Sequence, residues 1–313
     1  MSIKIYESKL QPSLQASFFK LLQRANPDKI ALNYFTLREY TLELIKKVWE
    51  LSASSKPIWK QGYKIKTINK DEYNCQWIYK EASDKKLTVF YIHGGAYLGG
   101  SLSDSRRNAL RYAINTGCAL FSVDYRISAA GAFPCALEDA LDAYKEMLRT
   151  LPKKSRVIII GDSAGGGLAL SLTKKLIEEG IKLPRKLILN SPWTDLSCSA
   201  ASYITNRFND TRLTERFLKE CARVYAGEHS MLKNQYVSPL YCDFTGFPPI
   251  HIHVGTSELL LSDSINVAFK ASNAGVNVKL KIWNGMFHMF HYYEGLIPES
   301  TKVCEYIYRD IMS

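Results

Sequence analysis

Residues 156–179 read RVIIIGDSAGGGLALSLTKKLIEE, and this stretch decides the fold. The run RVIII is nearly continuous apolar sequence, as expected of a strand buried on both faces of a parallel sheet. The segment after the glycines has the apolar content and length of a helix. Between them, Gly161-Asp-Ser163-Ala-Gly165 is a G-x-S-x-G turn, whose glycines allow a sharp strand-to-helix bend. The pattern predicts that Ser163 projects above the sheet as a nucleophile.

Further short runs typical of strands lie on both sides of this stretch. From residue 87 onward most are separated by helical patterns, which indicates crossover connections and a largely parallel sheet. The first two runs lack a helix between them and predict an antiparallel start. We therefore expect one α/β domain over residues 1–313, with eight strands and helices on both faces. The remaining runs are GYKIKTI, YNCQWIY, LTVFYIH, CALFSVD, KLILNS, IHIHVG and VKLKIW.

Two segments depart from this alternation. Residues 195–235 follow the strand KLILN and include a helical pattern over residues 212–225. An insertion at the carboxyl end of a central strand lies over the crevice in which such sheets bind ligands. Residues 1–55 carry apolar residues at helical spacing, once over residues 14–22 and again over residues 37–48. We interpret residues 1–55 and 195–235 as the elements of a helical cap.

A second chemical motif follows the strand LTVFYI, where residues 93–97 read HGGAY. Small residues let the backbone approach a substrate closely, so that N–H groups can stabilise the oxyanion formed in ester cleavage. The candidate donors are Gly94 or Gly95, with Ala96 as a further alternative, joined by Ala164, the residue after Ser163. Tyr97 and Leu98, which come next in the loop, are expected to contact the substrate together with cap side chains.

The base and the acid are expected near the ends of the last strands. In α/β folds that carry a serine in a G-x-S-x-G turn, the acid and then the histidine follow that serine along the chain. His288 follows the strand VKLKIW and is the favoured base, with His291 as the alternative. Glu258 follows IHIHVG and is the favoured acid, with Asp263 and Asp195 as alternatives. The acid would orient the imidazole and stabilise its charged form.

Composition narrows the class of protein. The chain has 313 residues, a formal net charge of +11 and seven scattered cysteines without a C-x-x-C pair. This cysteine pattern predicts free thiols in a reducing compartment, hence a cytoplasmic protein. No clustered ligands suggest a metal site. The lysines are dispersed among carboxylates, so we expect no nucleic-acid binding. No apolar run approaches the length that spans a bilayer, so we expect no stable membrane insertion. A homo-oligomer is compatible with the sequence.

Several motifs together resemble the hormone-sensitive lipase family of bacterial esterases. They are YIHGGAY, SVDYR, FPCALEDALDAY, GDSAGGGLAL, SPWTDL, SPLY and GTSELLLSD, spread over about residues 87–295. The resemblance implies a capped α/β-hydrolase fold, no cofactor, and hydrolysis of short- to medium-chain carboxylic esters. It also implies Ser163, His288 and Glu258 as the triad. The chain departs from the family in having Ala96 at the third oxyanion-loop glycine, and its acid is Glu where Asp is more common.

The same three residues would serve lactone or amide hydrolysis, because specificity depends on the shape of the pocket. A ligand receptor built on this fold is the alternative from another class. No residue of the predicted site is an evident anchor for charge, so neutral, apolar small-molecule esters are the expected substrates.

Overall fold

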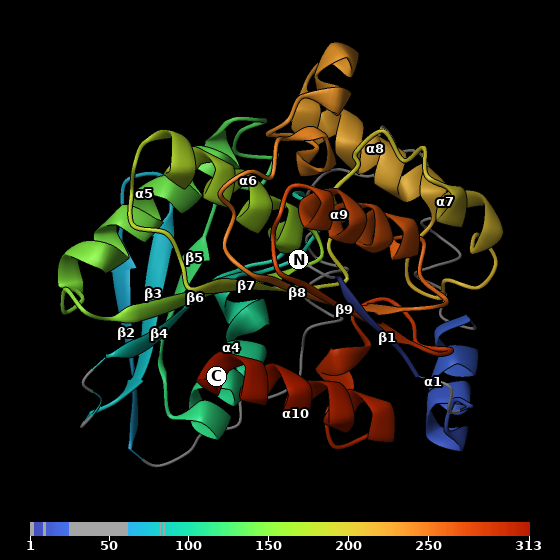
Figure 1. Cartoon of the computed structure of the whole chain (residues 1–313), viewed down its shortest axis with the longest axis horizontal. Coiled ribbons are helices and arrows are strands. Elements are labelled where there is room, and N and C mark those ends of the chain that lie inside the picture. Colours follow the sequence, from blue (N-terminus) through green and yellow to red (C-terminus); the bar gives the residue numbers. More distant parts are fainter. Residues whose placement is uncertain (1–2, 9–10, 25–61, 82, 84) are drawn as a thin grey trace.

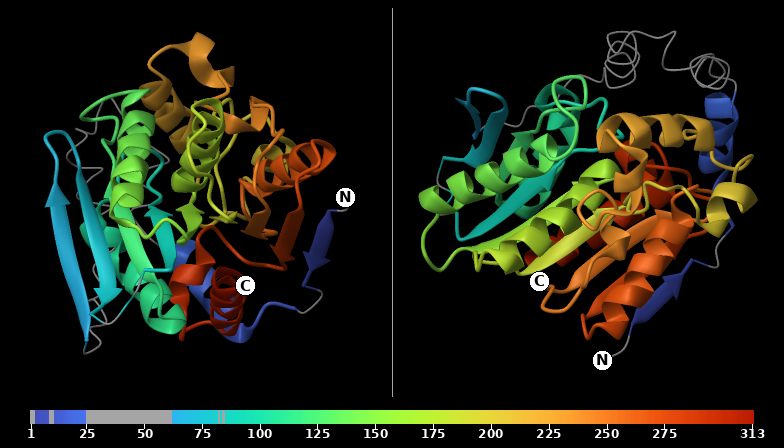
Figure 2. Two further views of the ribbon diagram at one scale, coloured as in Figure 1. Left: turned by 60° about the vertical axis from the view of Figure 1, so that its left-hand side comes forward. Right: turned by 90° about the horizontal axis from the view of Figure 1, so that it is seen from above.

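A nine-stranded sheet forms the centre of the computed structural model, which describes residues 3–8, 11–24, 62–81, 83 and 85–313. Figure 2 shows the twist of the sheet, with β2 at one edge and β1 at the other. In spatial order the strands are β1 (Lys4–Glu7), β9 (Val278–Trp283), β8 (Ile250–Gly255), β7 (Lys186–Asn190), β6 (Arg156–Asp162), β4 (Leu87–Ile92), β5 (Ala119–Asp124), β3 (Asn74–Lys80) and β2 (Tyr63–Asn69).

All eight expected runs are strands, and the pairings of β2 with β3 and of β3 with β5 are antiparallel, as predicted for the start of the sheet. The prediction of eight strands in total was wrong, because β1 adds a ninth alongside β9 in parallel. All four residues of β1 are exposed. β1 is only four residues long and lies at the edge of the sheet, so its pattern is too short to be recognised as a strand from the sequence.

Helices cover both faces of the sheet (Figure 1). Helices α5, α6 and α9 lie on one face, and α4 and α10 lie on the other. The helices are α1 (Leu14–Arg24), α4 (Leu102–Thr116), α5 (Cys135–Thr150), α6 (Ala164–Glu178), α7 (Ala201–Thr205), α8 (Glu215–Ala226), α9 (Leu261–Asn273) and α10 (Pro298–Met312), with short 3-10 turns η1 (His229–Lys233), η2 (Pro239–Tyr241) and η3 (Phe290–Tyr293).

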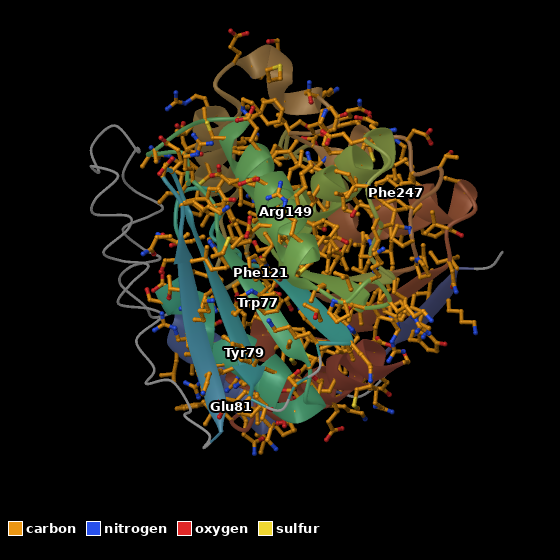
Figure 3. The ribbon with its side chains drawn as sticks, turned by 90° about the vertical axis from the view of Figure 1, so that its left-hand side faces the viewer. Trp77, Tyr79, Glu81, Phe121, Arg149 and Phe247 are labelled. Atoms are coloured by element: carbon orange, nitrogen blue, oxygen red, sulfur yellow. The ribbon has the colours of Figure 1, made fainter. Side chains whose placement is uncertain are left out.

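Each face of the sheet has its own apolar core, because side chains alternate along a strand. On β4, Phe90 packs into the core under α5 and α6, whereas Tyr91 packs into the core under α4 and α10. Figure 3 looks onto the β2–β3 side, where the rings of Trp77 and Phe121 meet edge to face at 4.8 Å between centroids. These cores hold the strands in register. The seven cysteines are free, as predicted.

The strand order places the candidate site. From β4 the chain passes through α4 to β5 on one side of β4, and then through α5 to β6 on the other side. Helices that leave in opposite directions open a crevice at the carboxyl ends of two adjacent strands. The HGGAY loop follows β4 and the G-x-S-x-G turn follows β6, so both motifs end at this crevice.

The segments predicted as cap elements hold further helices. Residues 195–235 contain α7, α8 and η1, which lie beyond α9 and α6 as seen from the sheet (Figure 1). The predicted N-terminal helix over residues 14–22 is α1, whereas residues 37–48 lie outside the described residues. The apolar side chains of α1 are mostly exposed, Leu14 by 87%, and only Ala16 is buried. Hydrogen bonds hold this helix, including those from the amide and hydroxyl of Ser13 to Glu299 at 2.6 and 2.8 Å.

Gly165 marks where the two motifs meet. A Cβ at this position would overlap the carbonyl oxygens of Ile92 and His93 at the end of β4. We expect Gly165→Ala to lower the free energy of unfolding by about 1–3 kcal/mol, because backbone atoms must separate to admit the methyl group. Denaturant unfolding measures the change. Gly180→Asn is the control, since Gly180 is exposed and a Cβ there meets nothing. Equal stabilities would contradict the close contact.

Candidate active site

Ser163 lies at the sharp turn that the G-x-S-x-G pattern predicts. It follows β6 directly and precedes the first residue of α6. Its backbone has φ 54° and ψ −118°, a conformation that costs free energy for a residue with a side chain. The carbonyl oxygen of Ser163 accepts hydrogen bonds from the amides of Gly166 and Trp193, both at 2.9 Å. These bonds hold the strained turn, and the N-terminus of α6 favours negative charge beside it.

Three side chains from separate loops form a hydrogen-bonded chain. His288 Nε2 lies 3.0 Å from Ser163 Oγ, and His288 Nδ1 lies 2.9 Å from Glu258 Oε2. Ser163 follows β6, Glu258 follows β8 and His288 follows β9, so the carboxyl edge of the sheet brings together residues distant in sequence. All three are buried, and Ser163 is 8% exposed.

Glu258 is fully buried, and its carboxylate has three donors. Oε1 accepts hydrogen bonds from the Gly255 amide at 2.6 Å and the Ser191 hydroxyl at 2.8 Å, while Oε2 faces His288. Burial raises the pKa of Glu258, and the Gly255 and Ser191 hydrogen bonds oppose that rise. Burial also lowers the pKa of His288. Its imidazole is therefore neutral at neutral pH, with one ring nitrogen able to accept a proton.

The alternative residues have other partners. Asp263 accepts hydrogen bonds from the amides of Thr194 and Asp195, each at 2.8 Å. Asp195 Oδ1 accepts a hydrogen bond from the Ser197 hydroxyl at 2.6 Å. His291 Nε2 lies 3.5 Å from Asp162. None of the three alternatives joins the chain of Ser163, His288 and Glu258.

The HGGAY loop lies against Ser163. A Cβ on Gly94 would stand 2.8 Å from the Asp162 carbonyl oxygen and 3.1 Å from Ser163 Cβ, so only glycine fits. Within the described residues, no hydrogen-bond acceptor is paired with the amides of Gly94 and Gly95. Ala96 has φ 52°, the left-handed conformation that glycine adopts at lower cost.

Known proteins resemble this chain in sequence and in fold. Residues 89–292 match the family model of the α/β-hydrolase fold. The chain is 34% identical to an acetyl-hydrolase of Streptomyces hygroscopicus over 74% of this chain and 77% of that protein. It is also 34% identical to an esterase of Acinetobacter venetianus, over 71% and 73% of the two chains. A hormone-sensitive lipase from a metagenome library has a solved structure that is 30% identical and superposes with a TM-score of 0.86, over 96% of this chain and 99% of that one.

The chain belongs to the hormone-sensitive lipase-like esterases.

In this esterase Tyr97 and Leu98 are both buried at 1% exposure. The ring of Tyr97, expected to contact substrate, stacks on Tyr225 of α8 with centroids 3.7 Å apart. The backbone of Tyr97 has a positive φ of 61° in this stacked arrangement. Its ring therefore links the loop that carries Gly94 to α8 of the predicted cap.

Basic side chains reach the surroundings of His288 from both segments that the sequence analysis interpreted as cap elements, residues 1–55 and 195–235. Lys20 Nζ of α1 donates to Ser257 Oγ at 3.0 Å, one residue before Glu258. Arg212 Nη1 donates to Tyr293 Oη at 3.3 Å, and its charge adds to burial in lowering the pKa of His288. The sequence analysis found no evident anchor for charge among the residues of the predicted site, and it did not single out Lys20 or Arg212. Nothing local in the sequence signals either contact.

The esterase buries a second carboxylate, that of Asp162, beside Ser163. Asp162 accepts hydrogen bonds from the hydroxyls of Tyr91 at 2.6 Å and Tyr292 at 3.1 Å and from the Asn190 amide at 2.8 Å. Burial alone would raise the pKa of Asp162, but the charge of His291 and these donors hold it below its ordinary value. The turn at Ser163 thus begins from a residue fixed by several side chains.

Within the described residues, no group of three or more His, Cys, Asp or Glu side chains is arranged to hold a metal ion. The helices described there include none long and apolar enough to cross a membrane.

We expect Asp162→Asn to lower the free energy of unfolding by about 1.5–3 kcal/mol at pH 7, because hydrogen bonds to a charged acceptor are lost. Since the folded-state pKa of Asp162 is depressed, the wild-type advantage is full above about pH 4 and fades as the pH falls through that pKa. Denaturant unfolding at several pH values tests this. Asp71→Asn, at an exposed aspartate, is the control. A pH-independent difference would exclude the charge as its cause.

Proposed function

We propose that the chain is a carboxylesterase that cleaves short- to medium-chain esters through Ser163, His288 and Glu258. The observation that carries this proposal is the continuous hydrogen-bonded chain of these side chains, with distances of 3.0 and 2.9 Å. A nucleophile, a base and an orienting acid within hydrogen-bond reach are what acyl transfer to serine needs. The names of the relatives, an acetyl-hydrolase and an esterase, support the same class of reaction.

The reaction has two halves. Ser163 Oγ attacks the ester carbonyl carbon while its proton passes to His288 Nε2. The bond to the alcohol oxygen then breaks, and His288 returns the proton to the leaving alkoxide. A water next gives a proton to His288 and attacks the acyl-enzyme, and the collapse of that intermediate releases the acid and restores Ser163. Glu258 stabilises the imidazolium that forms in each half.

The oxyanion of each tetrahedral intermediate would lie beside Gly94, Gly95 and Ala164. Among the residues that the structure describes, the amides of Gly94 and Gly95 have no acceptor, and their loop lies against Ser163. Loss of a single oxyanion donor typically costs about 2.7–4 kcal/mol in transition-state stabilisation. The stacking of Tyr97 on Tyr225 supports this role, because it fixes the loop before substrate arrives.

The proposed acyl range rests on the relatives. One is named an acetyl-hydrolase, and another solved relative, 27% identical with a TM-score of 0.84, was soaked with p-nitrophenyl butyrate. We propose that residues 1–313 act as one α/β-hydrolase domain, with residues 1–55 and 195–235 as the cap that bounds the acyl site.

We expect wild type to hydrolyse p-nitrophenyl esters with a maximum at short acyl chains across a series from acetate to laurate. Ser163→Ala should abolish hydrolysis, because the nucleophilic oxygen is gone. Ser230→Ala, at an exposed serine of η1, should retain wild-type rates. Hydrolysis that survives in purified Ser163→Ala would refute the nucleophile. Better activity on long-chain emulsions would refute the acyl range.

The pH profile tests the base. Burial lowers the pKa of His288 below the ordinary histidine value of about 6.5. We therefore expect kcat/KM to stay constant as the pH falls through about 6.5 and to decrease only at more acidic pH. Below its pKa the imidazole binds a proton and cannot accept one from Ser163. Stopped assays with p-nitrophenyl butyrate, paired with thermal unfolding at each pH, separate titration from loss of fold. A limb centred above pH 6.5 would contradict the effect of burial.

A further inference from the structure

The segment around α7 buries polar side chains and exposes apolar ones. Ser202, Asn206 and Asp210, spaced four residues apart, are all buried. Ile204 and Phe208 are exposed by 71% and 77%. Burying polar groups costs free energy unless they find hydrogen-bond partners. The three buried polar side chains therefore need hydrogen-bond partners inside the protein.

Their partners lie in the loop that carries Glu258. Asn206 Nδ2 donates to the carbonyl oxygens of Thr256 at 2.9 Å and Glu258 at 2.8 Å. Asp210 Oδ2 accepts from the Leu259 amide at 2.8 Å. Two side chains thus bind the backbone before, at and after the acid.

Ser202 extends this contact toward α9. Its hydroxyl donates to the Leu259 carbonyl oxygen, and the Ser262 amide donates to the Ser202 hydroxyl at 3.0 Å. The residue at the N-terminal boundary of α9, Leu260, has no side chain that could cap the helix. Side chains from residues 202–210 therefore supply several polar contacts of the loop between β8 and α9, beside the backbone hydrogen bonds that two of its amides donate to the end of β9 and the segment after it.

Asp210 is itself held in place. Its Oδ1 accepts from the amides of Arg212 at 2.8 Å and Leu213 at 2.9 Å. Burial raises the pKa of Asp210, and these amides and that of Leu259 oppose the rise. Its negative charge in turn opposes the lowering of the His288 pKa that burial causes. The charged and titratable groups around His288 are Glu258, Asp210, Asp162, Arg212 and His291.

We propose that Asn206 and Asp210 are positioning residues, which hold the backbone around Glu258 so that its carboxylate meets His288. Docking of residues 202–210 then becomes a condition for an assembled catalytic chain. Glutamate makes this support necessary, since it has one more rotatable bond than aspartate between backbone and carboxylate. The inference rests on the function proposed above.

Asn206→Ala removes both donors and should lower kcat for p-nitrophenyl butyrate about 10- to 100-fold with little change in KM, as expected when a catalytic group is misplaced by up to about 1 Å. Asp210→Asn keeps an acceptor for Leu259 but loses the charge. Its kcat should fall less, and the acidic limb of kcat/KM should move to lower pH, because a nearby negative charge favours protonated His288. Asn209→Ala, at an exposed neighbour, is the matched control.

A spectroscopic measurement makes the test independent of turnover. The proton between His288 Nδ1 and Glu258 should give a downfield proton NMR resonance in wild type and Asn209→Ala, and the resonance should be lost in Asn206→Ala. If Asn206→Ala does not fold, Asn206→Ser, which keeps one donor, is measured in its place. Wild-type kcat with the resonance retained, or a rise in KM alone, would overturn the proposal. A wild type that shows the resonance but cleaves no ester would refute the proposed function and leave the positioning role standing.

Discussion

The structure depends on a close backbone approach between the ends of β4 and β6. Gly165 touches the carbonyl oxygens that end β4, and Gly94 touches the carbonyl of Asp162 at the end of β6. No side chain fits between these segments, so the loop after β4 and the turn after β6 adopt their positions together. The strained φ of Ser163 and of Ala96 is the conformational cost of this contact. Apolar cores on both faces of the sheet offset that cost.

Around this contact the protein buries carboxylates and supplies each with fixed donors. Asp162 has tyrosine hydroxyls, Glu258 has a backbone amide and Ser191, and Asp263 has two successive amides. Burial makes a charged group costly, and hydrogen bonds to its charged form recover part of that cost. Because the donors come from different loops, each carboxylate also joins segments that the sheet alone leaves independent. The hydrogen bonds that stabilise these charges therefore also fix the positions of the loops around the site.

Features were predictable from the sequence when the residues that define them lie close together along the chain. The strand, glycines and helix around Ser163 are contiguous, and the eight long strands carry apolar runs, so both were predictable. Glu258 and His288 could be proposed from their places after strands. Ser191 was missed, because it lies 67 residues from Glu258 and no spacing rule connects them. The direction of the Tyr97 ring depends on a positive φ that composition does not reveal, and β1 buries nothing that a pattern could register.

The pairing of β1 with β9 has a consequence for how the chain is made. β1 is synthesised long before its partner β9, because more than 270 residues separate the paired positions Lys4 and Lys279. The amide of Ser13 likewise meets its acceptor only when Glu299 in α10 has been synthesised. Until then β1 has no partner, and the β8 edge of the growing sheet is open to intermolecular pairing. Closure of this edge therefore has to follow the synthesis of β9, and a nascent chain arrested before β9 would leave the edge of β8 unpaired.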